Sequence, residues 1–362
     1  MRPQKVRSRS RTSRREILRA PSLRRPLQNT GPVFDMVGSG GYYLRISRRA
    51  MACQFEVFLR PQDRSFVAAV HEALDEVDRL EAQMTVYRED SELSRLNRTA
   101  FLSPVAVEER LYLLLRFASA IGKETGGAFD ITAGPLIRCW GFFERKGRLP
   151  NDEELHAARE VTGWDKVTFD DAARSVSFCR QGVELNLGSI GKGYALDRAA
   201  EQLRKAGLRD FLIHAGHSSV LAFGDSNRGP GWEISIRDPQ VLQGDLGSFS
   251  LLDQGMSTSG AGEQFFTANG QRFGHILDPR SGRPGMGNLL CSVVAATAAR
   301  AEALSTAFFV MDPGEVQSYC EAHPQVGTIV LPASSTEEGE ASNSRPAPLC
   351  WGVTLRQTGV WS

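Results

Sequence analysis

The sequence lacks the features that mark several common classes of protein. Its six cysteines are scattered and form no C-x-x-C pair, which argues against a zinc site and against a disulfide framework. It holds no run of about 18 apolar residues, so no transmembrane helix is predicted. It also lacks an excess of charge: 43 lysines and arginines stand against 42 aspartates and glutamates. The overall charge therefore favours neither a nucleic-acid partner nor a membrane surface.

What remains is a chain of 362 residues, 41% of them hydrophobic, which is long enough to bury a sizeable core. Residues 1–35 differ from the rest: they carry nine arginines and no core-forming pattern, and we predict a disordered basic leader. Arg14-Arg15 resembles a twin-arginine export signal, but the apolar segment that export requires does not follow. A cytoplasmic protein is therefore favoured, with an exported or membrane-associated one as the alternative.

Residues 42–362 are predicted to form the folded part, with mixed helices and strands. Helical spacing of apolar residues predicts helices over residues 66–84, 108–125, 152–160, 195–206, 298–311 and 315–323. Alternating or short apolar runs predict strands over residues 42–46, 54–59, 167–169, 175–178, 183–187, 210–216, 232–239, 249–252, 256–260, 292–296, 327–331 and 351–357. A low-complexity segment at 334–348, rich in Ser, Glu and Pro, is interpreted as a surface insertion.

The stretch V-E-L-N-L-G-S-I-G-K-G-Y-A-L-D at 183–197 predicts a strand, a tight glycine turn and a helix. In such a turn, backbone N–H groups and a helix N-terminus approach an anion closely. Lys192 places a positive charge at the same point. Most glycine turns of this kind are simple connectors, so the motif alone leaves phosphate binding as one alternative.

Five segments, taken together and in this order, resemble the FAD:protein FMN transferase (ApbE) family: residues 87–97, 126–141, 186–197, 258–284 and 301–306. The resemblance covers roughly residues 42–357. It implies an α+β (mixed α/β) fold of largely antiparallel sheets with flanking helices, and an FAD cleft beside the glycine turn. It implies magnesium-dependent transfer of FMN from FAD to a threonine or serine hydroxyl of a target protein, with release of AMP.

The partner implied by this resemblance is an acceptor protein that carries a threonine or serine flavinylation motif. Nucleic acid is not expected as a partner, and the sequence does not indicate an oligomeric state. Two alternatives stay open: an FAD-binding protein without transferase activity, and an FAD pyrophosphatase that yields FMN and AMP. Residues 258–261 resemble an acceptor motif, but Gly262 stands where the acceptor hydroxyl would be, so self-modification is not expected.

Glu302 and Thr306 stand four positions apart on a predicted helix and therefore share a face. A carboxylate and a hydroxyl are hard oxygen ligands that suit Mg²⁺. The resemblance matches this pair to the helical metal ligands of the family and adds Ser189 in the glycine turn. The alternative is that Thr306 is a buried helical threonine and Glu302 an exposed acid.

Five positions depart from the family's usual pattern. Glu302 replaces Asp, Asn186 replaces Asp before the turn, and Gly191 replaces Ala before the lysine. A usual Gly-Gly-Asp reads Gly216-His217-Ser218 in this chain. Because Mg²⁺ demands near-ideal octahedral geometry, the longer side chain of Glu302 bears directly on whether the site is active.

The resemblance also implies which residues contact FAD and which transfer protons. The positions that match the family's FAD contacts are Met51, Tyr87, Ala128, Phe129, Asp130, Lys192 and Leu277. Phe129 would otherwise be a core aromatic, and Asp130 a turn cap. His275 and Asp278 are the candidates for removing a proton from the acceptor hydroxyl, or they brace the loop before Pro279.

Overall fold

The computed structural model describes residues 42–241, 244–262, 264–333 and 346–356. The basic leader expected at 1–35 and most of the low-complexity segment expected at 334–348 lie outside these residues. No helix within the described ranges is long and apolar enough to cross a membrane.

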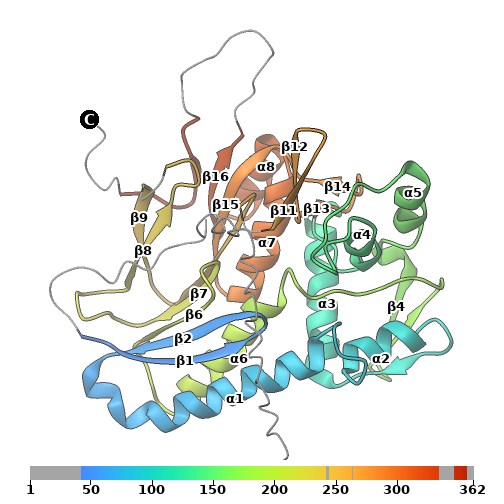
Figure 1. Ribbon diagram of the computed structural model, residues 1–362. Coiled ribbons are helices and arrows are strands. Elements are labelled where there is room, and N and C mark those ends of the chain that lie inside the picture. The colour runs from blue at the N-terminus through green and yellow to red at the C-terminus, as the bar shows by residue number, and fades with distance from the viewer. Residues whose placement is uncertain (1–41, 242–243, 263, 334–345, 357–362) are drawn as a thin grey trace, which may run out of the picture.

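A central sheet of eight strands organises the molecule (Figure 1). Every neighbouring pair in it is antiparallel. In spatial order the strands are β1 (Leu44–Ala50), β2 (Cys53–Leu59), β6 (Phe211–Ala215), β7 (Ser219–Phe223), β10 (Gln254–Gly260), β15 (Asn288–Ala295), β16 (Gly327–Pro332) and β17 (Leu349–Trp351). The mixed α+β fold with largely antiparallel sheets is thus confirmed.

Both faces of this sheet are buried, because side chains alternate along each strand. In β6, Phe211 and Ile213 enter the main core, whereas Leu212 enters a second core on the opposite face. The helices that contribute to the main core include α1 (Val67–Met84), α6 (Gly191–Lys205) and α7 (Ala298–Val310). The hairpin of β8 (Trp232–Arg237) and β9 (Asp245–Leu251) covers the second core. The result is a helix layer, a central sheet and a two-stranded layer.

The remaining elements surround this framework, and several of them lie in the right half of Figure 1. The helices are α2 (Glu92–Thr99), α3 (Glu109–Glu124), α4 (Gly134–Cys139), α5 (Asp152–Glu160) and α8 (Pro313–Ala322), with 3-10 turns η1 (Pro61–Phe66) and η2 (Trp164–Lys166). A three-stranded sheet joins β3 (Val105–Ala106), β5 (Ser175–Phe178) and β4 (Val167–Asp170). Two hairpins join β11 (Phe265–Ala268) to β12 (Gln271–Gly274), and β13 (Leu277–Asp278) to β14 (Arg283–Pro284).

The prediction of a strand at 183–187 is wrong. Its apolar residues are buried in alternation as expected, but Glu184 makes only an isolated bridge, to Ala133. The backbone N–H and C=O of Leu185 both bond the side-chain amide of Asn97, at 2.9 Å each. A side chain therefore takes the place of a partner strand, and the segment is extended chain rather than part of a sheet.

The predicted bounds of the strand at 351–357 are also wrong. The ladder ends at Trp351, and Arg356 makes an isolated bridge to Ser248. Of the elements that the sequence did not predict, β7, α4 and the β11–β12 hairpin all contribute residues or contacts to the site described below.

The crossing of α6 and α7 positions the site. Asp197 of α6 accepts the backbone N–H groups of Ala298 and Ala299 at 2.8 and 2.9 Å, and so caps the start of α7. Burial raises the pKa of this carboxyl to about 6. A Cβ atom on Gly193 would lie 2.7 Å from the backbone nitrogen of Ala299. The two helices can approach this closely because position 193 has no side chain, and Glu302 follows in the next turn of α7.

Candidate active site

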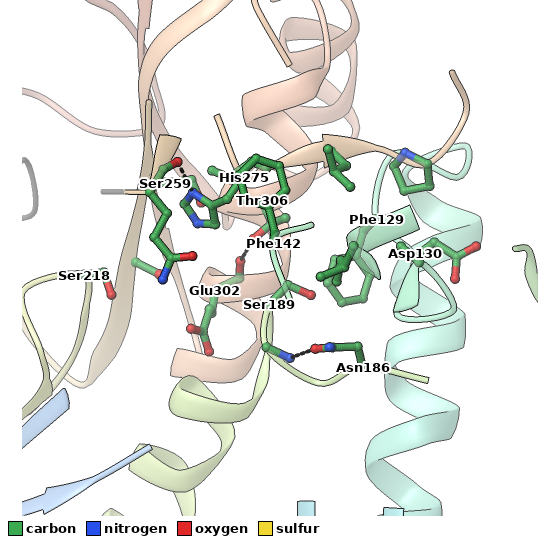
Figure 2. A pocket seen from close by; sticks show the side chains of 18 of the residues that line it. Phe129, Asp130, Phe142, Asn186, Ser189, Ser218, Ser259, His275, Glu302 and Thr306 are labelled. Atoms are coloured by element: carbon green, nitrogen blue, oxygen red, sulfur yellow. Dashed lines mark hydrogen bonds between the residues drawn. The ribbon is translucent and has the colours of Figure 1, made fainter. Parts of the chain in front are cut away.

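One cleft runs between the glycine turn, α7, the end of β10 and the base of the β11–β12 hairpin (Figure 2). It consists of a cavity of about 260 Å³ and a larger one of about 1020 Å³. Residues that line both cavities include Tyr87, Lys192 and His275, so the two cavities adjoin. Every predicted site residue except Asp278 lines this cleft.

The glycine turn leads into the N-terminus of α6 at the cleft wall. The side-chain Oδ1 of Asn186 accepts the N–H of Gly188 at 2.9 Å and shapes the turn. Helix α6 begins at Gly191, and its N-cap residue Ile190 makes no side-chain cap bond. Within the first turn, the N–H of Gly193 already donates to the carboxylate of Glu302. The positive end of the helix dipole and Lys192 stand beside the cleft, where they favour an anion.

Glu302 is buried, with 4% of its surface exposed, so the alternative of an exposed acid is wrong. One carboxylate oxygen accepts the N–H of Gly193 at 2.6 Å. The other oxygen pairs with the ammonium of Lys192 and accepts the hydroxyl of Ser219 at 3.5 Å. The carboxylate is thus fixed across the crossing of the two helices and faces the cleft.

Thr306 lines the same cavity one turn further along α7, and Ser189 lies across from that helix in the glycine turn (Figure 2). The hydroxyl of Thr306 donates to the carbonyl oxygen of Glu302 at 3.1 Å, as in many helical threonines. The described residues contain no group of three or more histidines, cysteines and acids that would hold a metal alone. The oxygens of Ser189, Glu302 and Thr306 are hard ligands of the kind that Mg²⁺ prefers.

Two of the departures from the family pattern have simple structural accounts. An aspartate at 186 would shape the turn through the same oxygen, so Asn186 changes the charge but not the bond. A Cβ at Gly191 would meet its nearest neighbours only at 4.0 Å, so alanine and glycine both fit there. His217 lines the larger cavity.

An aromatic platform stands at one end of the cleft. Tyr87, with 65% of its surface exposed, stacks on Phe143 at 4.8 Å between ring centroids. The guanidinium of Arg138 lies 3.5 Å from the centre of the Phe143 ring on which Tyr87 also stacks. Phe129, by contrast, is fully buried and belongs to the core, although it borders the smaller cavity.

Met51 reaches the larger cavity from the turn between β1 and β2. Met51 and Ala52 both have left-handed backbone conformations, with φ of 49° and 60°. Residues other than glycine adopt this region at a cost, and such strain concentrates at functional sites. The hairpin tip is therefore held in place at the cleft, as an FAD contact there would require.

Asp130 lines the smaller cavity, and one of its oxygens accepts the N–H of Thr132 at 2.8 Å. The turn-cap interpretation therefore holds for that oxygen. Burial raises the pKa of this carboxyl to about 6, although the bond from Thr132 opposes the shift.

Replacing Asp130 by asparagine is expected to stabilise the fold at neutral pH by about 3 kcal/mol. The folded pKa of about 6 lies above the ordinary 3.8, so ionisation of Asp130 destabilises the fold as pH rises through that interval. Asparagine keeps an oxygen for Thr132 without the charge. Urea unfolding at several pH values should show wild type and variant converging near pH 4. A constant difference at all pH values would contradict this account.

His275 lines the cleft at the base of the β11–β12 hairpin. Its backbone N–H and its ring Nδ1 both contact the carbonyl oxygen of Gln264, at 3.0 and 3.2 Å. Asp278 lies on β13 outside the cleft lining, and its carboxylate pairs with Arg280 at 3.0 Å. Arg280 also bonds Glu315 of α8 at 2.8 Å. This geometry favours the loop-bracing alternative for Asp278.

Sequence reasoning assigned no cleft contact to several residues that line the cleft. Phe143 gives no signal beyond its position next to Phe142. A group of polar residues also lines the smaller cavity: Ser218, Ser257, Thr258, Ser259 and Gln264. Two hydroxyl pairs link β10 to its neighbours: Thr258 with Ser292 at 2.8 Å, and Ser259 with Ser305 at 3.1 Å. Only the run of three small polar residues at 257–259 in β10 hints at this wall.

Comparison with known proteins gives consistent results. Residues 51–330 match the ApbE family. The FAD:protein FMN transferase of Haemophilus influenzae is 31% identical over 79% of this chain and 85% of its own length. That of Vibrio cholerae is 32% identical over 75% of this chain and 83% of its own length.

Solved structures of ApbE proteins have the same fold. The crystal structure of the ApbE protein from Thermotoga maritima superposes with a TM-score of 0.74 at 29% identity, and covers 80% of this chain and 94% of that one. The flavin transferase ApbE from Vibrio cholerae superposes with a TM-score of 0.70 at 25% identity, and covers 82% of this chain and 95% of that one.

Proposed function

The chain belongs to the ApbE family and is an FAD:protein FMN transferase, and we propose that it uses magnesium and modifies a threonine or serine of its target. One observation carries this proposal. The cleft brings the N-terminus of α6 and Lys192 within reach of the hard oxygens of Glu302 and Thr306. The first two features suit a diphosphate, and the oxygens suit the cation that accompanies it.

The diphosphate of FAD would lie against the glycine turn. The positive end of the α6 dipole and the ammonium of Lys192 would attract its oxygens. Ser189, Glu302 and Thr306 would hold magnesium beside it. When bound, that ion supplies charge neutralisation to the transferring phosphoryl group.

The flavin and adenine rings need flat, apolar contacts. We assign one ring system to the Tyr87–Phe143 platform, which is exposed and already stacked. Met51, Ala128 and Leu277 provide further apolar cleft surface. Asp130 would accept an N–H of the ring system through the oxygen that Thr132 does not use.

His275 is assigned as the base. A carbonyl oxygen only accepts, so the contact with Gln264 places the ring proton on Nδ1, and Nε2 carries the lone pair that takes a proton. The acceptor hydroxyl gives its proton to Nε2, and its oxygen bonds the phosphorus of the FMN half. The bond from that phosphorus to the bridging oxygen breaks, and AMP leaves. Asp278 holds the loop that carries His275.

The test is AMP release from FAD by the purified protein, with magnesium or with EDTA, and with or without a peptide that carries an accessible threonine. We expect AMP only with magnesium, and FMN attached to the peptide. The attachment is checked by mass spectrometry. AMP with free FMN and an unmodified peptide would identify a pyrophosphatase instead. Bound FAD without any AMP would contradict both enzymatic proposals.

A further inference from the structure

Lys192 and Glu302 form an ion pair inside the cleft. Lys192 comes from the first turn of α6, and Glu302 from α7. The exposed fractions of the two side chains are 25% and 5%, so the pair is largely shielded from water. Glu302 also accepts the N–H of Gly193, which means that donors of this chain occupy both of its oxygens.

This pairing conflicts with the tasks that each residue has in the proposed function, on which the present inference rests. A cation that approaches Glu302 in an empty cleft meets the positive charge of Lys192. A diphosphate that approaches Lys192 meets the negative charge of Glu302. Because the pair is shielded, both repulsions are stronger than they would be in bulk water. Each residue therefore blocks the ligand of the other.

We propose that Lys192 is an exchangeable counter-ion, which pairs with Glu302 in the empty cleft and with the diphosphate once FAD is bound. The exchange makes FAD and the divalent cation bind cooperatively, and either ligand alone binds weakly. Lysine suits this role because its ammonium sits on a flexible four-carbon stem. Glu302 stays in place during the exchange, because the N–H of Gly193 holds its other oxygen.

The first experiment measures cation binding without FAD, by calorimetry with Mg²⁺ and by electron paramagnetic resonance with Mn²⁺. We expect Lys192→Met to bind the cation at least about fivefold more tightly than wild type. Lys205→Met is the matched control: it lies on the same helix, and its pair with Glu201 is exposed. Unchanged cation affinity in Lys192→Met, with weaker FAD binding, would show that Lys192 serves the diphosphate alone and would overturn the proposal.

The second experiment does not require Lys192→Met to fold. It measures FAD affinity in EDTA by quenching of flavin fluorescence. Glu302→Gln releases Lys192 and is expected to bind FAD at least about fivefold more tightly. Glu144→Gln removes a charge from the larger cavity without releasing Lys192, and is expected to change FAD affinity less than about twofold. Equal gains in both variants would mean a general charge effect and no exchange.

Both experiments measure binding and not turnover. A protein that releases no AMP can still show the exchange, in which case the proposed chemistry fails and the counter-ion role stands. If the protein transfers FMN but neither affinity changes in the variants, the proposed function stands and the counter-ion proposal is wrong.

Discussion

Replacing Glu302 by glutamine is expected to lower the rate of AMP release, at saturating FAD and magnesium, by about 100- to 1000-fold. Glutamine has nearly the same shape, and its amide oxygen still accepts the N–H of Gly193. The fold is therefore kept while the negative charge beside the cation is lost. Because the same change frees Lys192, the variant should bind FAD well and still fail to turn it over.

Steady-state assays of AMP release, with circular dichroism to confirm the fold, check this result. Glu302→Asp is the control: it keeps a carboxylate and introduces the residue that is usual in the family. Its rate should stay within about tenfold of wild type, since the charge that neutralises the phosphoryl group is retained. A Glu302→Gln variant with wild-type rates would place the cation elsewhere.

Replacing Gly193 by alanine is expected to destabilise the fold by at least about 3 kcal/mol, or to prevent folding. The new Cβ would lie 2.5 Å from the carbonyl carbon of Ala298 and 2.7 Å from the nitrogen of Ala299. These are backbone atoms at the start of α7 and cannot rotate away. The helices must separate, which also removes the bond from the N–H of Gly193 to Glu302.

Gly191→Ala is the matched control, two positions earlier on the same helix. Its Cβ would meet nothing closer than 4.0 Å, so the change in stability should stay within about 1 kcal/mol. Thermal and urea unfolding of both variants measure the difference. Similar stabilities for the two variants would mean that the close approach of α6 and α7 does not need a glycine.

Much of the fold could be predicted because the apolar spacing typical of a helix is visible in the sequence. The apolar spacing along 66–84 and 298–311 placed α1 and α7 within a residue or so of their observed ends. The strand expected at 183–187 failed for a physical reason. Alternation of apolar residues indicates which side of an extended segment faces the core. It does not indicate which groups bond the backbone N–H and C=O of that segment. Asn97, far away in sequence, supplies those bonds.

The candidate site could be predicted as a set of residues but not as a set of interactions. The ordered motifs identified Ser189, Lys192 and Glu302 because each lies in a stretch that resembles the family. The ion pair between Lys192 and Glu302 has no local signal, since it joins two helices far apart in the chain. Phe143 was missed for the same reason, because its partner Tyr87 comes from a distant loop.

The crossing of α6 and α7 also sets an order of events during synthesis of the chain. Glu302 follows Gly193 by 109 positions, so a growing chain carries the glycine turn well before the carboxylate that the turn contacts. At a ribosomal pace of about 5–20 residues per second, this interval lasts roughly 5 to 20 seconds. Throughout it, the bond from Gly193 to Glu302 cannot form, so the crossing is assembled only after residue 302 has been made.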